Sequence, residues 1–242
     1  MEKIELVSRQ QHVKAVILQY IRDNAPNGEQ LPSEVQFAQM LGVSRNTVRE
    51  ALRGLESEGV IYSRHGVGTF SMSVGKGMRS SINLLERPTK IISDHGHVPG
   101  IVDLNVRTVA AKERIARSLS IAPGVKVLCI DSIRTADGVP IVYVQDYLIY
   151  EKGLEEAYKN YPGDSLFEFL FEHSKVRIGH SVCDIKAAIG SKAIRDKLAL
   201  PKSTALVLLE QTHYSKKGQP VLYSDSYFNS DKFNFTVVRK SM

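Results

Sequence analysis

The sequence predicts an α+β protein made of two parts that follow one another along the chain. Three observations support this prediction. Three short amphipathic helical patterns come first, a β-prone hairpin follows them, and the remaining chain contains a repeat of one helix and two strands. With 242 residues, 43% hydrophobic composition and a formal net charge of +6, the chain is long and apolar enough to form real cores.

Three helices are expected in the first part. Residues 13–24 repeat apolar side chains every three or four positions, which is typical of an amphipathic helix. Ser33 and Gln36 have the spacing of a capping box for a second helix, which Gly42 ends. Ser44 is expected to cap the third helix after a tight turn. Two helices joined by a short turn that contains glycine form a helix-turn-helix.

The third helix has more arginine than its packing requires. Val48 and Leu52 supply an apolar stripe, whereas Arg45, Arg49 and Arg53 recur every four residues on another face. Residues at the start of such a helix reach base edges in the DNA major groove, where arginine can form two hydrogen bonds to guanine. A solvated face balanced by nearby glutamates is the alternative for an isolated helix. The segment that follows the helix favours DNA.

That segment is expected to form a two-stranded hairpin. Residues 61–62 and 69–70 are β-prone and flank a glycine-rich turn. The tip, Arg64, His65 and Gly66, can approach phosphates or the minor groove, because glycine lets the backbone come close. The hairpin is therefore interpreted as the wing of a winged helix-turn-helix.

The first part closely resembles the winged-helix domain of the GntR family of bacterial transcription regulators. The matching segments are LPSE (31–34), LGVSRNTVREALRGLESEGVI (41–61) and RHGVGTF (64–70). The resemblance implies that the chain binds double-stranded operator DNA. The residues expected at the DNA interface, from the resemblance and from the helix and wing patterns, are Ser33, Ser44, Arg45, Asn46, Thr47, Arg49, Arg53, Arg64, His65 and Gly66.

The expected organisation is a DNA-binding domain at 1–75, a linker at 76–92 and a second domain at 93–242. The linker prediction rests on the small and basic residues that begin after residue 70. One of them, Lys76, is expected to strengthen binding to DNA of any sequence.

A repeat defines the second domain. Residues 111–149 align with residues 191–229 at an offset of 79 residues that rises to 80 at the turns. Each copy is expected to form a helix, a strand, a G-x-P turn and a second strand, so two copies predict an antiparallel sheet with a pseudo-twofold arrangement. A further helix is expected at 165–174, with Ser165 as its N-cap.

The second domain is similar to the UTRA effector-binding domain in the HutC branch of the GntR family, which shares the chorismate lyase fold. In that branch the first copy carries R-x-R-x-x-x-G-x-P, and Arg134 matches the second arginine. Ser132 replaces the first arginine, and Val144 stands where an acidic residue is usual. One anion-binding group and one hydroxyl-binding carboxylate are therefore missing, which argues against the amino-sugar phosphate that is common in the branch.

A small anionic metabolite, such as a sugar phosphate or an organic acid, is the expected effector. An arginine fork and the free N–H groups of the helix that starts at Ser165 together favour an anion. The residues expected in the effector pocket are Thr89, Lys90, Ser132, Arg134, Tyr143, Ser165, Asp225 and Tyr227. Ordinary strand packing is the alternative for the last two. For Arg134 the alternative is a surface ion pair with Asp131 or Asp137.

These observations predict a ligand-responsive transcription regulator, interpreted as a repressor, that binds an inverted-repeat operator as a homodimer. The N-terminus lacks the apolar core of a signal peptide, and no apolar segment is long enough to span a membrane. A cytoplasmic location without a membrane partner is therefore expected. No cofactor is expected.

Three other interpretations are less favoured. A lyase-like enzyme fused to a DNA-binding domain is the alternative, but no acid–base pair suited to catalysis is evident, and a fold does not imply an activity. A structural nucleoid protein would need basic surface throughout, whereas residues 93–242 hold 20 basic and 17 acidic residues. Asp94, His95 and His97 suggest a metal site, but no second cluster has metal-ligand spacing. Neither catalytic residues nor a metal site is expected.

Overall fold

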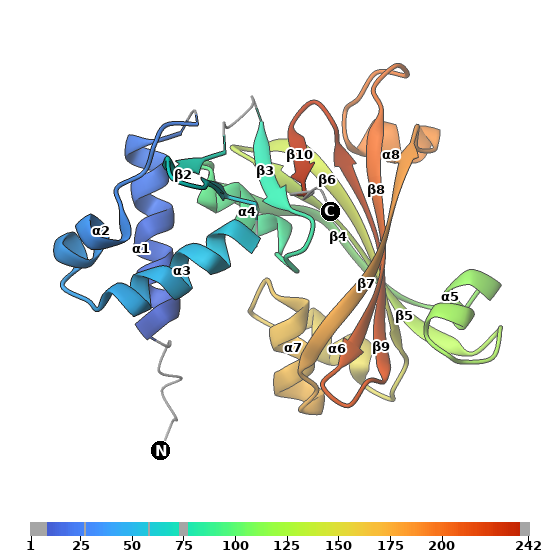
Figure 1. Cartoon of the computed structure of the whole chain (residues 1–242). Helices are drawn as coiled ribbons and strands as arrows, with labels where there is room; N and C mark the ends of the chain where they lie inside the picture. The colour runs from blue at the N-terminus through green and yellow to red at the C-terminus, as the bar shows by residue number, and fades with distance from the viewer. Residues whose placement is uncertain (1–8, 27, 58, 73–76, 238–242) are drawn as a thin grey trace. The chain divides into compact units, whose positions relative to one another are not determined.

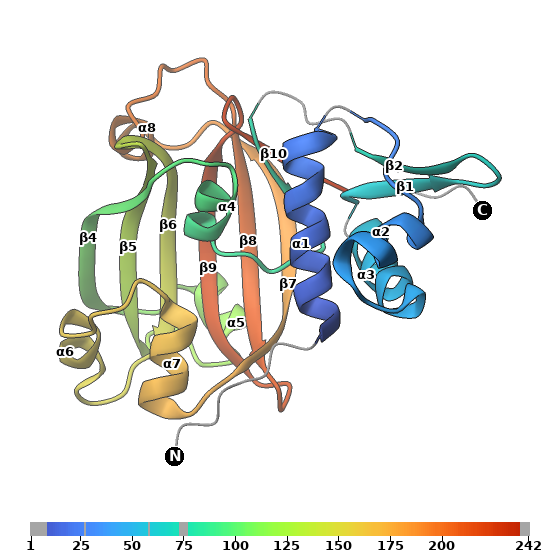
Figure 2. The ribbon, with the colours of Figure 1, turned by 90° about the vertical axis from the view of Figure 1, so that its left-hand side faces the viewer.

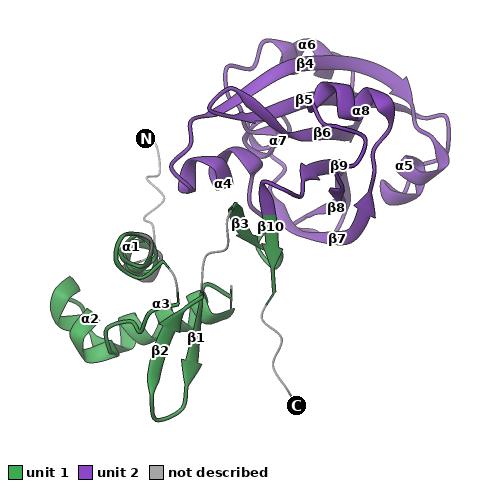
Figure 3. Ribbon diagram, turned by 90° about the horizontal axis from the view of Figure 1, so that it is seen from above, with its two compact units in different colours: residues 1–84, 234–242 green, residues 85–233 purple. Residues whose placement is uncertain are grey.

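The computed structural model describes residues 9–26, 28–57, 59–72 and 77–237 (Figure 1). The chain forms two compact units, which are residues 1–84 with 234–242 and residues 85–233 (Figure 3). The domain boundaries expected from the sequence, at residues 75 and 92, stay a prediction. Lys76 lies outside the described residues.

The first unit contains the helix-turn-helix and the wing. These two parts are formed by α1 (Arg9–Asn24), α2 (Glu34–Leu41), α3 (Arg45–Ser57), β1 (Ile61–Arg64) and β2 (Gly68–Ser71). Ser33 forms the predicted capping box, because its hydroxyl accepts from the N–H of Gln36 and its own N–H donates to the Gln36 side chain. Gly42 ends α2 in the left-handed conformation, with a φ of 61°. Ser44 caps α3 by accepting from the N–H of Thr47 at 3.2 Å.

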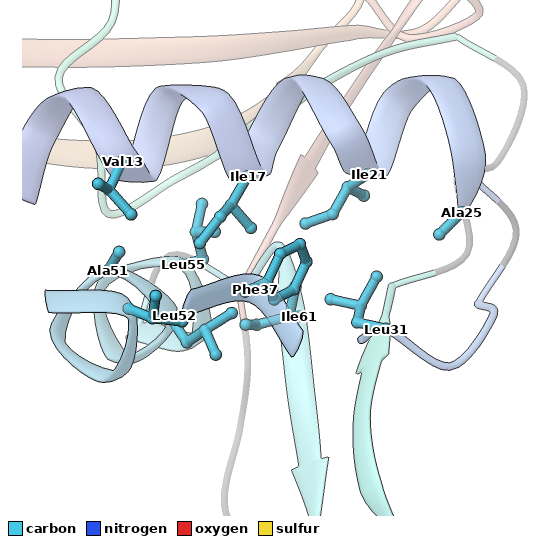
Figure 4. Packing of buried hydrophobic residues seen from close by; sticks show 11 residues of the cluster. Val13, Ile17, Ile21, Ala25, Leu31, Phe37, Ala51, Leu52, Leu55 and Ile61 are labelled. Carbon is cyan, nitrogen blue, oxygen red and sulfur yellow. The ribbon is translucent and has the colours of Figure 1, made fainter. Parts of the chain in front are cut away.

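The core of the first unit lies between α1 and α3. Ile17 and Leu55 are completely buried, and Phe37 packs edge-to-face on Tyr20 with ring centroids 5.3 Å apart. Figure 4 shows the apolar side chains of α1 facing those of α3, with Phe37 between the helices. This packing fixes one face of α3 inside the unit and leaves the opposite face to solvent.

The wing is a tight hairpin that contacts the loop before α2. β1 and β2 pair antiparallel, with Tyr62 opposite Phe70. Gly66 and Gly68 have φ values of 74° and 142°, which residues with a side chain rarely adopt. A Cβ atom on Gly68 would also lie 2.5 Å from Nε2 of Gln30. The backbone geometry therefore requires the second glycine of the wing turn, and a side chain there would also displace the amide of Gln30.

Replacing Ser33 by alanine should destabilise the first unit, because the change removes the hydroxyl that caps α2. The expected cost is about 1 kcal/mol in the free energy of unfolding. Urea unfolding followed by circular dichroism measures this cost. Ser63→Ala, at an exposed position of β1, is the matched control and should change the free energy by less than about 0.5 kcal/mol. Equal unfolding midpoints for Ser33→Ala and wild type would contradict the capping role.

The second unit is built on one antiparallel sheet of six strands. The strands are β4 (Pro99–Ala110), β5 (Lys126–Ala136), β6 (Val139–Ile149), β7 (Ile178–Ala188), β8 (Leu206–Ser215) and β9 (Pro220–Asn229). They lie in the order β4-β5-β6-β9-β8-β7, so the two predicted copies meet where β6 pairs with β9. Each copy has one more strand than predicted, because β4 pairs with β5 and β7 pairs with β8. The order is pseudo-twofold, as the repeat predicts.

Helices cover both faces of this sheet. They are α4 (Pro88–Asp94), α5 (Glu113–Ser118), α6 (Leu154–Lys159), α7 (Leu166–Ser174) and α8 (Lys192–Lys197). We call the face that carries α4, α6 and α7 the front face, and the face that carries α5 and α8 the back face (Figures 1 and 2). Because side chains alternate along a strand, Ile130 and Leu148 pack on the front face, whereas Val127 and Tyr147 pack on the back face.

Regular structure also occurs in the range expected to be a linker. β3 (Met78–Ser81) pairs with β10 (Phe233–Thr236), and α4 begins at Pro88. The helix predicted at 165–174 is present as α7, with Ser165 accepting from the N–H of Glu168. Within the described part of the chain, no helix is long and apolar enough to cross a membrane. The predicted fold class, a helix-turn-helix unit with a wing followed by an antiparallel sheet unit, is confirmed.

Candidate functional sites

The solvent face of α3 carries the arginines that the sequence singled out. The side chains of Arg45 and Arg53 are 60% and 67% exposed, and Asn46 is exposed between them. Val48 and Leu52 of the same helix are buried in the core of the unit. The helix therefore presents cations to solvent from a rigidly packed support.

Glu34 at the start of α2 holds one of these arginines in place. Its carboxylate accepts from Nε of Arg49 at 2.9 Å and from Nη2 at 2.8 Å, which is the bidentate arrangement. Nη2 of Arg45 lies 3.6 Å from the same carboxylate. Hydrogen bonding by Arg49 lowers the pKa of Glu34, so the carboxylate stays ionised. The remaining N–H groups of the Arg49 guanidinium can bond to DNA.

The wing tip is exposed and basic. His65 and Gly66 are exposed at the turn, and no atom lies within 4 Å of the position that a Cβ on Gly66 would take. The guanidinium of Arg64 lies over the rings of Tyr62 and Phe70, with 5.6 and 5.4 Å from its central carbon to their centroids. The hydroxyl groups of the other candidates take part in the caps of α2 and α3, and these candidates are Ser33, Ser44 and Thr47.

The front face of the second unit holds a pocket with about 590 Å³ of empty space, its open mouth included. β5, β6, β9 and β8 form its floor. The first residues of the unit and the start of α7 form its walls. We call it the sheet pocket. Its lining residues are Leu85, Glu86, Arg87, Pro88, Thr89, Arg134, Val144, Asp146, Asp164, Leu166, Phe167, Gln211, His213, Leu222, Ser224 and Ser226.

The structure places some of the predicted effector residues at this pocket. Thr89 and Arg134 line it. Ser165 is buried and caps α7, next to the wall residues of that helix. Ser132 is buried on β5, and its hydroxyl has no hydrogen-bond partner among the described residues. Lys90 instead forms ion pairs with the acidic residues four positions away on either side.

Tyr143, Asp225 and Tyr227 lie on the back face and do not line the sheet pocket. Their nearest neighbours in β6 and β9 point to the front, and successive side chains of a strand point to opposite faces. Asp225 accepts from Nη1 and Nη2 of Arg114 in α5, at 2.8 and 2.5 Å. The rings of Tyr143 and Tyr227 pack with centroids 6.2 Å apart. For Asp225 and Tyr227 these contacts agree with the alternative of ordinary packing, and their role in an effector pocket stays a prediction, as does that of Tyr143.

Arg134 does not form the surface ion pairs that were its alternative role. Asp131 accepts from Nη1 of Arg107 at 2.5 Å, and Asp137 lies 2.6 Å from Nδ1 of His97. Nε of Arg134 is buried, and no described residue accepts its hydrogen. A guanidinium with an unsatisfied N–H in a pocket is a ready partner for an anion.

A buried chain of polar groups crosses the floor of the pocket. Oγ of Ser224 donates to Oδ1 of Asp146 at 2.5 Å and lies 3.2 Å from Nε2 of His213. Because the serine proton points to the carboxylate, Nε2 carries the proton that Ser224 accepts, and Nδ1 is left as an acceptor. In the described part of the chain nothing donates to Nδ1. We call Asp146, Ser224 and His213 the acceptor chain.

Burial sets the charges of the acceptor chain. It raises the pKa of Asp146 to about 6 and lowers the pKa of His213 to about 4. Near neutral pH the chain therefore contains one carboxylate and one uncharged imidazole. This carboxylate and the Arg134 cation both line the sheet pocket.

Replacing Asp146 or His213 should change how the free energy of unfolding depends on pH. The two replacements should change it in opposite directions. Folding raises the pKa of Asp146, so its contribution to stability rises as the pH falls from 7 towards 4. Folding lowers the pKa of His213, so its contribution falls as the pH drops from 6.5 to 4. Compared with wild type, His213→Gln should gain stability on acidification, and Asp146→Asn should lose it.

Urea unfolding between about pH 4.5 and about pH 7.5 measures these slopes. Glu151→Gln, an exposed carboxyl group outside the pocket, is the control for the loss of one charge and should follow the wild-type profile. Parallel profiles for His213→Gln and Asp146→Asn would show that burial does not shift the two groups in opposite directions.

The two histidines of the suspected metal stretch have protein partners. Nδ1 of His95 lies 2.7 Å from the carbonyl oxygen of Ile91, and Nδ1 of His97 lies 2.6 Å from the carboxylate of Asp137. Over the residues described, no group of three or more histidine, cysteine, aspartate or glutamate side chains is placed to hold a metal ion.

Two features were not predicted from the sequence, which are the contact of Glu34 with Arg49 in the first unit and most of the floor of the sheet pocket. The capping-box pattern places Glu34 in the first turn of α2, but the pattern does not show that α3 lies beside it. Asp146, Ser224 and His213 lie on three different strands, so only the pairing of those strands brings them together.

Comparisons with known proteins agree on the nature of both units. The model of "Bacterial regulatory proteins, gntR family" matches residues 9–70, and the model of the "UTRA domain" matches residues 94–234, which is more than half of the chain. The transcriptional repressor NagR of Bacillus subtilis (strain 168) is 24% identical over 90% of this chain and 91% of its own length. The probable transcriptional regulator PhnF of Escherichia coli (strain K12) is 25% identical over 95% of each chain.

A solved structure has the same fold over nearly the whole length. The crystal structure of PhnF from Mycobacterium smegmatis has a TM-score of 0.60 and 24% identity, and the match covers 95% of this chain and 100% of that one. The curated relatives are transcription regulators rather than enzymes. The prediction of a regulator without enzymatic activity is therefore confirmed, and the lyase alternative is not favoured.

Proposed function

The chain belongs to the GntR family of bacterial regulatory proteins with a UTRA domain, and we propose that this ligand-responsive transcriptional regulator represses its target genes until a small anionic metabolite enters the sheet pocket. The observation that carries this proposal is the Arg134 guanidinium, which lines the pocket and whose buried Nε has no partner among the described residues. An anion would satisfy it. A sugar phosphate or an organic acid has the required charge.

GntR regulators bind operator DNA, and in this chain we assign the reading of bases to the start of α3. Arg45 and Arg49 lie in the first turns of the helix, where a recognition helix meets base edges. The wing tip, Arg64, His65 and Gly66, would contact phosphates or the adjacent minor groove. The remaining candidates at the starts of α2 and α3 would fix the register of the protein on the duplex, and these are Ser33, Ser44, Asn46 and Thr47.

Repression, the HutC branch and a cytoplasmic place of action are further parts of the proposal. The relative NagR is named a repressor, and it aligns with nine-tenths of this chain, which supports the same sign of regulation here. The UTRA domain and the Arg134 motif support the HutC branch. DNA-binding regulators act where the chromosome lies, which in a bacterium is the cytoplasm.

The active form is proposed to be a homodimer on an inverted repeat, because one recognition helix contacts few bases. The purified protein should sediment at about twice the 27.0 kDa of one chain. DNA selected by the protein from a random duplex library should contain two half-sites about one helical turn apart, or a multiple of it. A monomer on a single asymmetric site would overturn this assignment.

The effector part is tested on the same selected operator. Phosphorylated sugars and organic acids are first screened by thermal shift, because a ligand that binds the native state raises its melting temperature. Compounds that stabilise the protein should also lower its affinity for the operator. If stabilising anions leave operator binding unchanged, the proposed repressor mechanism is rejected.

A further inference from the structure

Four permanent cations gather at one end of the sheet of the second unit, where two loops meet. All four are exposed. The two loop segments, residues 173–180 and 214–219, contain no acidic residue, although Glu172 precedes the first of them. We call the four cations the basic patch. They are Lys175 and Arg177, between α7 and β7, and Lys216 and Lys217, in the turn between β8 and β9.

Backbone contacts hold the two loops together. The N–H of Lys216 donates to the carbonyl oxygen of Arg177 at 3.0 Å. Gly179 eases this close approach, because a Cβ atom there would lie only 3.1 Å from Cα of Lys216. Ser215 is buried, and its hydroxyl accepts from the N–H of Lys217 at 3.3 Å. The turn that carries the two lysines is therefore fixed to the loop before β7.

An aromatic ring orients the other two cations. The central guanidinium carbon of Arg177 lies 3.6 Å from the centroid of the Phe171 ring, and Nζ of Lys175 lies 5.8 Å from the same centroid. Nζ of Lys175 also donates to the carbonyl oxygen of Glu172 at 3.2 Å. A guanidinium that is already stacked on a ring loses little further freedom when it binds an anion. The basic patch is therefore oriented before it meets a partner.

The fold does not require lysine in this turn. The equivalent turn of the first copy, residues 136–139, has no lysine and carries Asp137. The Asp137 carboxylate contacts His97 and accepts from the N–H of Val98. Cations that lie close together repel one another, and together they raise the local positive potential. That potential attracts a partner with closely spaced negative charges.

The chemistry of the basic patch fits the phosphates of duplex DNA better than a protein surface. Protein interfaces are depleted of lysine and have an apolar core. Residues 171–180 and 214–219 are all described, and none of their large hydrophobic side chains is exposed. Lysine binds phosphate as a point charge, without reading bases.

We propose that the basic patch binds phosphates of the DNA that flanks the operator, without reading its sequence. Both units belong to one chain, so operator binding by the first unit brings the flanking duplex to the second at high local concentration. Phosphate contacts of this kind add affinity that depends on salt and not on sequence. The inference rests on operator binding, which is part of the proposed function, and it does not involve the effector.

Two duplexes that share the selected operator test the proposal. One ends at the operator, and the other continues on each side for about two helical turns, or roughly 20 base pairs, of arbitrary sequence. Fluorescence anisotropy gives the dissociation constant of the full chain between about 50 and about 200 mM salt. For wild type, the flanks should tighten binding at least about 5-fold at the lowest salt. They should also steepen the plot of log affinity against log salt by about 0.9 for each phosphate contacted.

Paired lysine variants locate the contact. The double variant Lys216→Gln with Lys217→Gln removes two exposed charges and should lose most of the gain from the flanks, while it binds the short duplex like wild type. The matched control, Lys192→Gln with Lys202→Gln, removes two exposed lysines near α8 at the opposite end of the sheet and should keep the full gain (Figure 1). Hydroxyl-radical footprints should show flank protection by wild type and by the control only.

Each result bears on the flank contact. If wild type gains no affinity from the flanks, or if the variant of Lys216 and Lys217 keeps the gain, the contact is overturned, while tight binding of the short duplex leaves operator binding intact. Loss of the gain in the control would show that net charge alone is responsible, and it would overturn the contact too. A wild-type chain that binds neither duplex would overturn operator binding and the flank contact with it.

Discussion

Arg49→Ala is expected to weaken specific operator binding by about 1–3 kcal/mol, or about 5- to 150-fold, and to relax the base preference at one position of each half-site. Arg49 lies in the second turn of α3 with part of its guanidinium held by Glu34. The variant loses a preoriented donor. It also leaves the Glu34 carboxylate without its main partner, beside the negatively charged DNA. Electrophoretic mobility shifts on the selected operator and on single-base variants measure both effects.

Control variants distinguish the loss of the contact between Arg49 and DNA from repulsion of DNA by the Glu34 carboxylate. Arg117→Ala, which removes an exposed arginine of α5 in the other unit, should bind the operator like wild type. If Glu34 repels DNA once Arg49 is gone, the double variant Glu34→Ala with Arg49→Ala should recover part of the affinity. Wild-type affinity and base preference for Arg49→Ala would show that α3 is not the recognition helix.

Arg134→Ala should fold, bind the operator normally and lose its response to the effector. A typical coupling energy of about 1–3 kcal/mol changes operator affinity about 5- to 150-fold in wild type, and the variant should show almost no change. The physical reason is that Arg134 is the cation of the pocket floor, while every residue assigned to DNA lies in the other unit. Operator affinity with and without effector measures the loss.

The same coupling has a reciprocal consequence. If the effector lowers operator affinity by some factor, the operator must lower effector affinity by the same factor. Effector titration in the presence and absence of DNA checks this equality. Arg117→Ala should keep the full response in both directions. An undiminished response in Arg134→Ala would place the effector site elsewhere.

Local patterns predicted most of the fold, because they involve residues close in sequence. The capping box of Ser33 and Gln36 and the left-handed Gly42 fix the bounds of α2 without any tertiary information. The repeat predicted four of the six sheet strands. The edge strands β4 and β7 lie before the aligned copies, so the alignment could not reveal them. The pairing of β3 with β10 joins distant parts of the chain and has no local pattern.

The candidate sites likewise combine features that local sequence patterns predict with features that depend on tertiary packing. Helical periodicity placed the arginines of α3 on one face, but the bond between Arg49 and Glu34 depends on the packing of α2 beside α3. In the sheet, Asp225 was predicted for the pocket and Ser224 was not. A shift of one residue along a strand exchanges the two faces, and sequence alone does not set the register of β9.

The repeat has a consequence for how the pocket treats its ligand. Arg134 and His213 occupy equivalent positions of the two copies, at the offset of 79 residues, and Asp146 and Ser226 do so at the offset of 80. All four line the same pocket. A duplication that had kept both copies identical would have made a binding site with interchangeable ends, indifferent to which way round a ligand entered. The groups at these positions differ instead, with a permanent cation in one copy and an uncharged imidazole in the other, so the two ends of the pocket are chemically distinct.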